Sequence, residues 1–119
     1  MSNFRKLLVW QKAMSLTTKI YTSTQKFPKE EIFGLTSQLR RCTISIPSNI
    51  AEGIGRDSNP ELIRFINISV GSLFELQTQL EIAKNILYLN TEEFNNLYED
   101  SREIERMLIA FLKKLKENK

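Results

Sequence analysis

The chain has 119 residues, of which 41% are hydrophobic and 26% charged, and this size and composition indicate one globular domain over residues 1–119. It contains no histidine and one cysteine, which excludes an internal disulfide and a zinc site of the usual cysteine–histidine type. Because histidine is also the commonest general base, we expect a protein that is not an enzyme and holds no metal or cofactor. The single cysteine fits a reducing cytosol, and no apolar run approaches the about 20 residues of a membrane span. We therefore expect a cytoplasmic protein without a membrane partner, and the sequence identifies no small-molecule partner.

The first predicted helix covers about residues 5–25. Its apolar residues follow one another at steps of three, four or seven, which places them on one stripe facing a bundle core. This stripe consists of Val9, Ala13, Leu16, Ile20 and Phe27. The net charge of the chain is +3, and residues 1–26 hold five basic residues and no acidic one. Lys12 and Lys19 share a face away from the stripe, which is either a surface for an anionic partner or an ordinary solvated face.

The second predicted helix runs from about residue 29 to 55 and carries two apolar stripes about 120° apart. The first contains Leu35, Leu39, Cys42, Ile46, Ile50 and Gly53, and the second contains Phe33, Ile44, Ala51 and Ile54. A helix that is apolar on two sides is buried from two sides, which favours a domain core on one side and a second subunit on the other. Pro47 removes an amide donor and crowds the carbonyl four residues back, so we expect either a kink near residues 43–47 or two helices meeting there.

The third predicted helix runs from Asn59 to about Tyr88. Beside its core stripe, a second apolar line includes Ile63, Val70 and Phe74. Gly71 lies in the interior of this helix, where glycine costs up to about 1 kcal/mol relative to alanine. We therefore expect a neighbouring helix to pack closely against it.

The fourth predicted helix runs from Thr91 to about Lys116, and we interpret the acidic residues of its first half as a solvated face. Lys113, Lys114 and Lys116 close it, as the helix dipole favours. No segment shows sustained alternation of apolar and polar residues, which argues against strands. Four helices with short connections indicate an all-α fold, an antiparallel up-down four-helix bundle with a proline-kinked second helix.

Four blocks of sequence carry a resemblance to a known family: LVWQKAMSL at 8–16, FGLTSQLRR at 33–41, SIPSNIAEG at 45–53 and GSLFELQTQLEIAK at 71–84. The chain resembles the bacterial four-helix-bundle proteins encoded within intervening sequences of 23S ribosomal RNA genes. That family is similar to the accessory protein of diversity-generating retroelements. The resemblance implies a ring-shaped homopentamer with an affinity for nucleic acid and without an established enzyme activity.

Six basic residues are candidates for contacts with nucleic acid. Guanidinium groups bind phosphate oxygens in a fork, and Arg41 lies on the polar arc of the second predicted helix, with Arg40 beside it. The alternative makes Arg40 an anchor of a subunit interface and Arg41 a partner in an internal ion pair. Arg56 follows Glu52 by four residues, the spacing of an ion pair within a helix. The six candidates are Lys12, Lys19, Arg40, Arg41, Arg56 and Arg64.

The second apolar stripes of the second and third predicted helices form the candidate oligomer interface. They consist of Phe33, Ile44, Ala51, Ile54, Ile63, Val70 and Phe74. Together with the resemblance, these stripes predict a non-enzymatic homo-oligomer, an accessory protein that binds RNA or DNA. The alternative is a structural or scaffolding homo-oligomer whose further partner is another protein.

Overall fold

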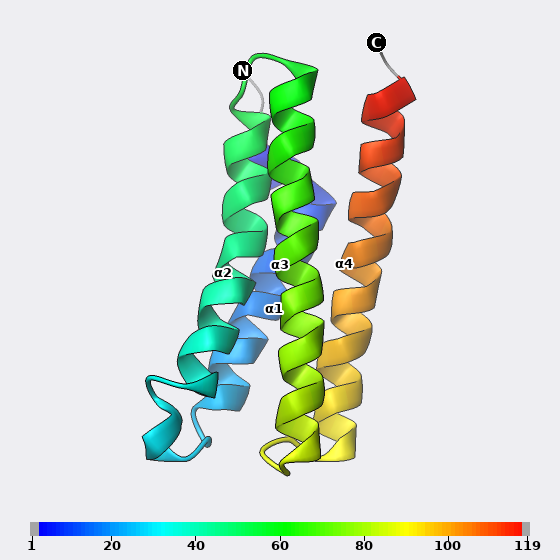
Figure 1. The fold of residues 1–119 in the computed structure, drawn as a ribbon. Helices are drawn as coiled ribbons and strands as arrows, with labels where there is room; N and C mark the ends of the chain where they lie inside the picture. The colour runs from blue at the N-terminus through cyan, green and yellow to red at the C-terminus, as the bar shows by residue number, and fades with distance from the viewer. Residues whose placement is uncertain (1–2, 118–119) are drawn as a thin grey trace.

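The computed structural model describes residues 3–117 as a bundle of four α-helices, which confirms the predicted all-α fold class. The helices are α1 (Leu8–Thr24), α2 (Leu35–Ile54), α3 (Asn59–Asn85) and α4 (Thr91–Glu117), and the short 3-10 helices η1 (Phe4–Lys6) and η2 (Lys29–Glu31) precede α1 and α2. Successive helices run in opposite directions (Figure 1). The first described residues, the last ones and the α2–α3 turn therefore lie together at one end of the bundle, which we call the terminal end (residues 3–8, 52–64 and 110–117). The other two turns lie at the opposite end, which we call the turn end (residues 21–36 and 82–96).

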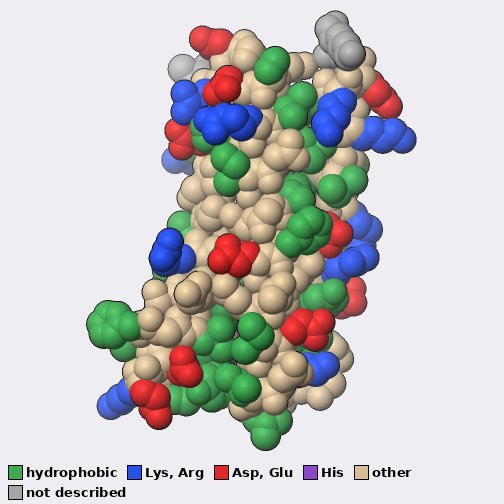
Figure 2. Space-filling model, in the orientation of Figure 1, with side chains coloured by type: hydrophobic (Ala, Val, Ile, Leu, Met, Phe, Trp, Pro, Cys, Tyr) green, Lys and Arg blue, Asp and Glu red, His purple; other side chains and the backbone are tan. Residues whose placement is uncertain are grey.

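The core runs the length of the bundle, which measures 47 × 22 × 20 Å. Each helix contributes apolar side chains at steps of three or four residues, because these positions share one face of a helix. The predicted core stripe of α1 is confirmed, since Val9, Leu16 and Ile20 are all buried. Some large apolar side chains remain exposed, and many of them gather toward the turn end (Figure 2), where Phe33 and Leu87 are almost fully exposed.

Pro47 lies inside α2, which continues as one helix from Leu35 to Ile54. The structure thus shows one helix where the sequence allows one or two. Because proline has no amide hydrogen, the carbonyl of Thr43 lacks the usual donor four residues along. The hydroxyl of Thr17 on α1 lies 3.2 Å from this carbonyl oxygen and 2.9 Å from the carbonyl oxygen of Ala13 in its own helix. A neighbouring helix therefore offers the donor that α2 itself lacks.

The first residue of α2 is Leu35, several residues later than the sequence predicts. Residues 29–31 form the separate turn η2, and the Glu31 carboxylate accepts a 3.0 Å hydrogen bond from the backbone amide of Leu35. This side chain caps α2 at its first residue, where backbone amides have no partner within the helix. Phe33 consequently precedes α2 and does not continue the apolar stripe on which the sequence places it.

Small residues bring α2 and α3 into close contact. A Cβ atom added to Gly53 would lie only 2.9 Å from the Cβ of Phe65, and Ser69 donates a 2.9 Å hydrogen bond to the carbonyl of Ile46. Gly71 differs, because no atom of another described helix lies within 4 Å of the position that its Cβ would occupy. The close packing expected at Gly71 is therefore not found within the described part of a single subunit.

α3 ends at Asn85, three residues earlier than the sequence predicts. Leu87 has a φ of 67°, in the left-handed region that often ends a helix, although glycine is the usual residue there. The amide of Tyr88 then donates a 2.8 Å hydrogen bond back to the carbonyl of Ala83, which closes the helix end.

Tyr88 joins the two turns of the turn end. Its hydroxyl donates a 2.9 Å hydrogen bond to the carboxylate of Glu31, and its ring lies 5.2 Å from that of Phe27. The Leu35 amide and the Tyr88 hydroxyl both donate to Glu31, which lowers the pKa of this carboxyl below its ordinary value. The same hydrogen bond raises the pKa of the Tyr88 hydroxyl.

Candidate nucleic-acid interface

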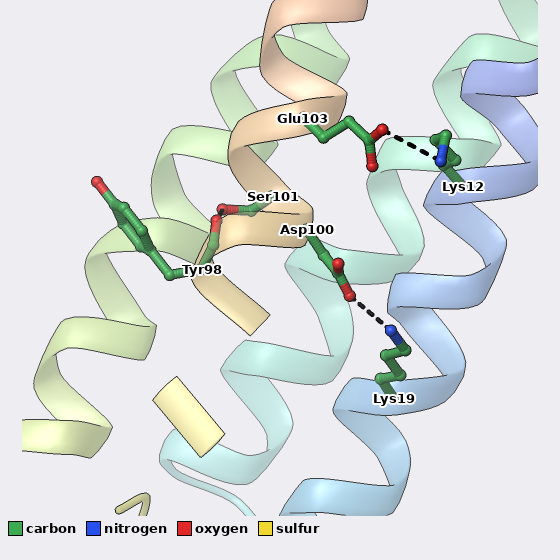
Figure 3. Close-up of polar contacts among 6 residues, drawn as sticks. All are labelled: Lys12, Lys19, Tyr98, Asp100, Ser101 and Glu103. Atoms are coloured by element: carbon green, nitrogen blue, oxygen red, sulfur yellow. Dashed lines mark hydrogen bonds and ion pairs between the residues drawn. The ribbon is translucent and has the colours of Figure 1, made fainter. Parts of the chain in front are cut away.

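Lys12 and Lys19 lie on α1 at its boundary with α4 and point toward acidic residues of that helix (Figure 3). The ammonium nitrogen of Lys12 is 3.2 Å from a carboxylate oxygen of Glu103, and that of Lys19 is 2.7 Å from one of Asp100. Lys26, seven residues further along α1, pairs with a third carboxylate of α4. The basic face of α1 is thus matched by acidic residues of α4 and is not a free cationic surface.

Arg40 is half-buried and connects α2 to the end of α1. Its Nε donates a 3.0 Å hydrogen bond to the hydroxyl of Thr24, and a terminal nitrogen lies 3.4 Å from the carbonyl oxygen of Tyr21. The guanidinium also lies 4.6 Å from the centroid of the Tyr21 ring. These contacts use two of the five N–H donors of the guanidinium and hold it against the end of α1, so Arg40 has three donors left for a phosphate.

Arg56 and Arg64 lie on the two sides of the α2–α3 turn, and both contact the ring of Phe65. Their guanidinium carbons are 4.8 and 4.7 Å from its centroid. Arg56 forms a 2.9 Å ion pair with Glu52, at the spacing that the sequence predicts, and Arg64 lies 3.5 Å from a carboxylate oxygen of Glu61. Both arginines therefore have a carboxylate and an aromatic partner within the subunit.

The side chain of Arg41 has no hydrogen bond or ion pair within residues 3–117, unlike the side chains of the other five candidates. It is exposed on α2 and borders a polar pocket of about 160 Å³ together with Ser45, Ser72 and Glu75. Cys42 also lines this pocket, and burial raises the pKa of its thiol to about 12, so that the thiol is protonated at neutral pH. The pocket offers a phosphate one cation, beside a carboxylate that would repel it.

The seven candidate interface residues differ in the surface that they offer to a second subunit. Three are exposed by 94%, 42% and 47%, namely Phe33, Ile44 and Phe74. Three more are half-buried, namely Ala51, Ile54 and Ile63. Val70 is 8% exposed and belongs to the core of its own subunit, so it has little surface left to bury.

Two other kinds of site are absent from the part of the chain that the structure describes. There, no group of three or more acidic or cysteine side chains could hold a metal ion. None of the described helices combines the length and the hydropathy that crossing a bilayer requires.

Comparison with known proteins identifies the family. The family model of the 23S rRNA-intervening sequence protein matches residues 5–110. This chain belongs to that family. The crystal structure of a protein of unknown function from the S23 ribosomal protein family of Bacteroides thetaiotaomicron VPI-5482 is also similar, with a TM-score of 0.81 and 26% identity, over 89% of this chain and 99% of that one. No curated protein matches the chain.

In this member of the 23S rRNA-intervening sequence family, the excess of positive charge lies at the terminal end. The terminal end holds seven basic and four acidic residues, and the turn end holds three basic and four acidic ones. The middle of the bundle, which consists of the remaining residues within 3–117, holds six basic and six acidic residues. Figure 2 shows Lys and Arg side chains gathered toward the terminal end, with a few acidic ones between them. The excess therefore comes from segments that are far apart in the sequence.

Five exposed basic residues of the terminal end are absent from the sequence-based candidates. Within residues 3–117, none of them has an ion-pair partner: Arg5, Lys6, Lys113, Lys114 and Lys116. In the sequence, the helix dipole already accounts for the three lysines, and nothing connects them to the other two. The up-down topology is the signal that could have found them, because antiparallel helices of similar length bring the first, middle and last segments to one end.

Proposed function

We propose that this chain is a non-enzymatic, cytoplasmic accessory protein that binds RNA or DNA through phosphate groups. The observation that carries the proposal is the positive charge of the terminal end, where five exposed cations have no ion-pair partner within residues 3–117. Such a surface attracts a polyanion, and nucleic acid that binds to it releases counterions. The resemblance to the proteins encoded in 23S rRNA intervening sequences, which implies an affinity for nucleic acid, favours nucleic acid over other polyanions.

Self-assembly is part of the proposal, and the resemblance implies a homopentamer. Phe33, Ile44 and Phe74 support it, because they expose apolar surface that a second subunit could bury. In a closed ring with cyclic symmetry, each subunit presents its terminal end in an equivalent position around the axis. Phosphate contacts that are weak in one subunit would then add up through avidity.

The test is fluorescence anisotropy of the purified protein with end-labelled hairpin RNA, duplex DNA and single-stranded DNA, titrated across a series of salt concentrations. Each phosphate contact contributes roughly −0.7 to −0.9 to the slope of log K against log salt, so five contacts from one subunit predict a slope of about −4. Phosphate contacts are strongest at low salt. Binding to none of the three probes under that condition would reject the proposal.

A scaffolding homo-oligomer that binds another protein is the second candidate function. The exposed apolar side chains at the turn end favour it, above all Phe33 and Leu87, which are 94% and 87% exposed. Apolar contacts are not screened by ions, whereas contacts between charges are. Partner binding that persists at high salt, together with no affinity for nucleic acid, would support this second candidate.

A further inference from the structure

We propose that nucleic acid binds to the terminal end of the bundle. In this end-on arrangement its phosphate backbone contacts the terminal end and does not lie along α1. This inference rests on the proposed function. It adds which surface of the protein binds and whether the nucleic acid is double- or single-stranded. The contacts come from five basic residues: Arg5, Lys6, Lys113, Lys114 and Lys116. They belong to η1 and to the last turns of α4, so the folded bundle has to bring them to one end.

The lysines of α1 are less suited to this task. A phosphate that approached Lys19 would also approach the Asp100 carboxylate, whose oxygen lies 2.7 Å from the lysine nitrogen. Two opposite charges at this distance largely cancel for an incoming ion, and the carboxylate repels it directly. The five terminal cations have no such neighbour in an ion pair within residues 3–117.

Acidic residues do not neutralise the terminal end. Of its four acids, Glu52 and Glu61 are held in ion pairs with Arg56 and Arg64. These two pairs leave the five cations opposed only by two further acids, Asp57 and Glu117. The net positive charge of the end is therefore carried by side chains that form no ion pair within residues 3–117, of which Arg5 also contacts an aromatic ring, with its guanidinium carbon 5.4 Å from the centroid of Phe4.

The width of the terminal end limits what it can recognise. The bundle is 20–22 Å across, whereas the major groove of duplex DNA is about 12 Å wide. The end is thus too wide to enter a groove, and its side chains reach phosphates and not the edges of bases. The aromatic side chains described at this end, Phe4 and Phe111, are half-buried, and the ring of Phe4 already contacts Trp10 and Arg5, so neither provides an open platform on which unpaired bases could stack.

These features favour double-stranded nucleic acid over single strands. A duplex presents two rows of phosphates to a cationic surface as wide as the bundle, and a single strand gains nothing from stacking here. A width of 22 Å spans about six phosphates of one strand at a spacing of about 3.4 Å. We therefore expect a minimal site of about six base pairs per subunit and similar affinity for duplexes of different sequence.

The test compares glutamine variants of the full chain in the anisotropy assay with duplex DNA. The first variant replaces three lysines of the terminal end: Lys113→Gln, Lys114→Gln and Lys116→Gln. The matched control replaces three lysines of the turn end: Lys26→Gln, Lys29→Gln and Lys84→Gln. Both lower the formal net charge from +3 to 0. We expect the first variant to bind at least about tenfold more weakly at low salt, and the slope of log K against log salt to become less negative by about 2 to 3. The control should change affinity by less than about twofold.

The outcomes separate this inference from the proposed function. Equal losses in the two variants would mean that net charge alone matters and would overturn the end-on arrangement, as would tighter binding to single strands than to duplexes. A wild-type protein that binds no probe would instead reject the proposed function. Circular dichroism verifies folding. If the first variant does not fold, Arg5→Gln with Lys6→Gln tests the same surface from η1, with an expected loss of about 1 to 2 in slope.

Discussion

At the scale of single residues, a side chain of another helix lies where it can compensate for the amide that Pro47 lacks. The Thr17 hydroxyl reaches the Thr43 carbonyl, and it also lies within hydrogen-bond distance of the Thr43 hydroxyl. A carbonyl without a donor in a buried position costs about 1–3 kcal/mol, so this contact is part of what allows a proline at a buried position of α2.

We predict that Thr17→Val lowers the free energy of unfolding by about 1 kcal/mol, because valine keeps the shape of threonine and removes the donor. Thermal denaturation would show this as a decrease of a few degrees in Tm. Thr18→Val is the matched control, since the Thr18 hydroxyl is exposed and donates only within α1. In a Pro47→Ala background, which restores the amide, the cost of Thr17→Val should shrink. An equal cost in both backgrounds would contradict the compensation.

Glu31 links α2 to the α3–α4 turn and makes stability depend on pH. Its pKa is lowered in the folded protein, so its contacts stabilise the fold above the ordinary value of 4.5 and are lost as the pH falls through the folded value. We predict that Glu31→Gln is less stable than the wild type at neutral pH and that the difference disappears in acid. Urea denaturation across a pH series measures this, with Glu30→Gln as control. A difference that did not vary with pH would contradict the prediction.

At the scale of elements, the distance between α2 and α3 is set by residues without bulk. Gly53 lies where a methyl group would meet Phe65 at 2.9 Å and Leu62 at 3.0 Å. The hydrogen bonds from Ser69 to the backbone of α2 and from Ser72 to Ser45 join the same two helices. These two helices therefore pack with their backbones close together.

We predict opposite effects of alanine at the two glycines of these helices. Gly53→Ala should destabilise the protein by about 1–3 kcal/mol, since the added methyl group meets a Cβ that cannot move without the backbone. Gly71→Ala should stabilise it by about 0.5–1 kcal/mol, because alanine favours a helix and has open space there. Urea denaturation measures both. A loss at Gly71 would indicate that another subunit packs closely on α3 at that position.

At the scale of the whole molecule, the topology brings charged residues together that are far apart in the sequence. The lysines of α1 meet carboxylates of α4, about 70 to 90 residues further along the chain. The acidic residues interpreted as a solvated face of the fourth helix are, in part, the partners of these lysines. Unpaired cations also occur elsewhere within residues 3–117, such as Arg41 and Lys29, but five of them lie at the terminal end, where basic residues outnumber acidic ones by seven to four.

Assembly is tested by Ala51→Glu, which places a carboxylate on the apolar face of α2 that is expected to meet a second subunit. We predict a lower oligomeric mass in sedimentation velocity with an unchanged helical spectrum, because a buried carboxylate without a partner is costly. Ser48→Glu, at an exposed position of the same helix, should leave the mass unchanged. A full oligomeric mass for Ala51→Glu would mean that the interface lies elsewhere.

Local patterns predicted the helices and their buried faces because apolar periodicity reports which side of a helix leaves water. The stripe through Val9, Leu16 and Ile20 is an example. Apolar periodicity did not predict that α2 begins at Leu35. Periodicity continues through Phe33, but the helix begins where the Glu31 carboxylate caps the Leu35 amide, and a pattern of hydrophobicity contains no information on such a hydrogen bond.

The family, the helical bundle and the size of the positive excess follow from the order of the amino acids. Which cations are available to a ligand depends on how the helices pack. Lys12 and Lys19 are paired with carboxylates across a helix boundary, whereas Lys6 and Lys113, more than 100 residues apart, lie at one end of the bundle. The physical reason is that the energy between charges depends on their separation in space and not along the chain.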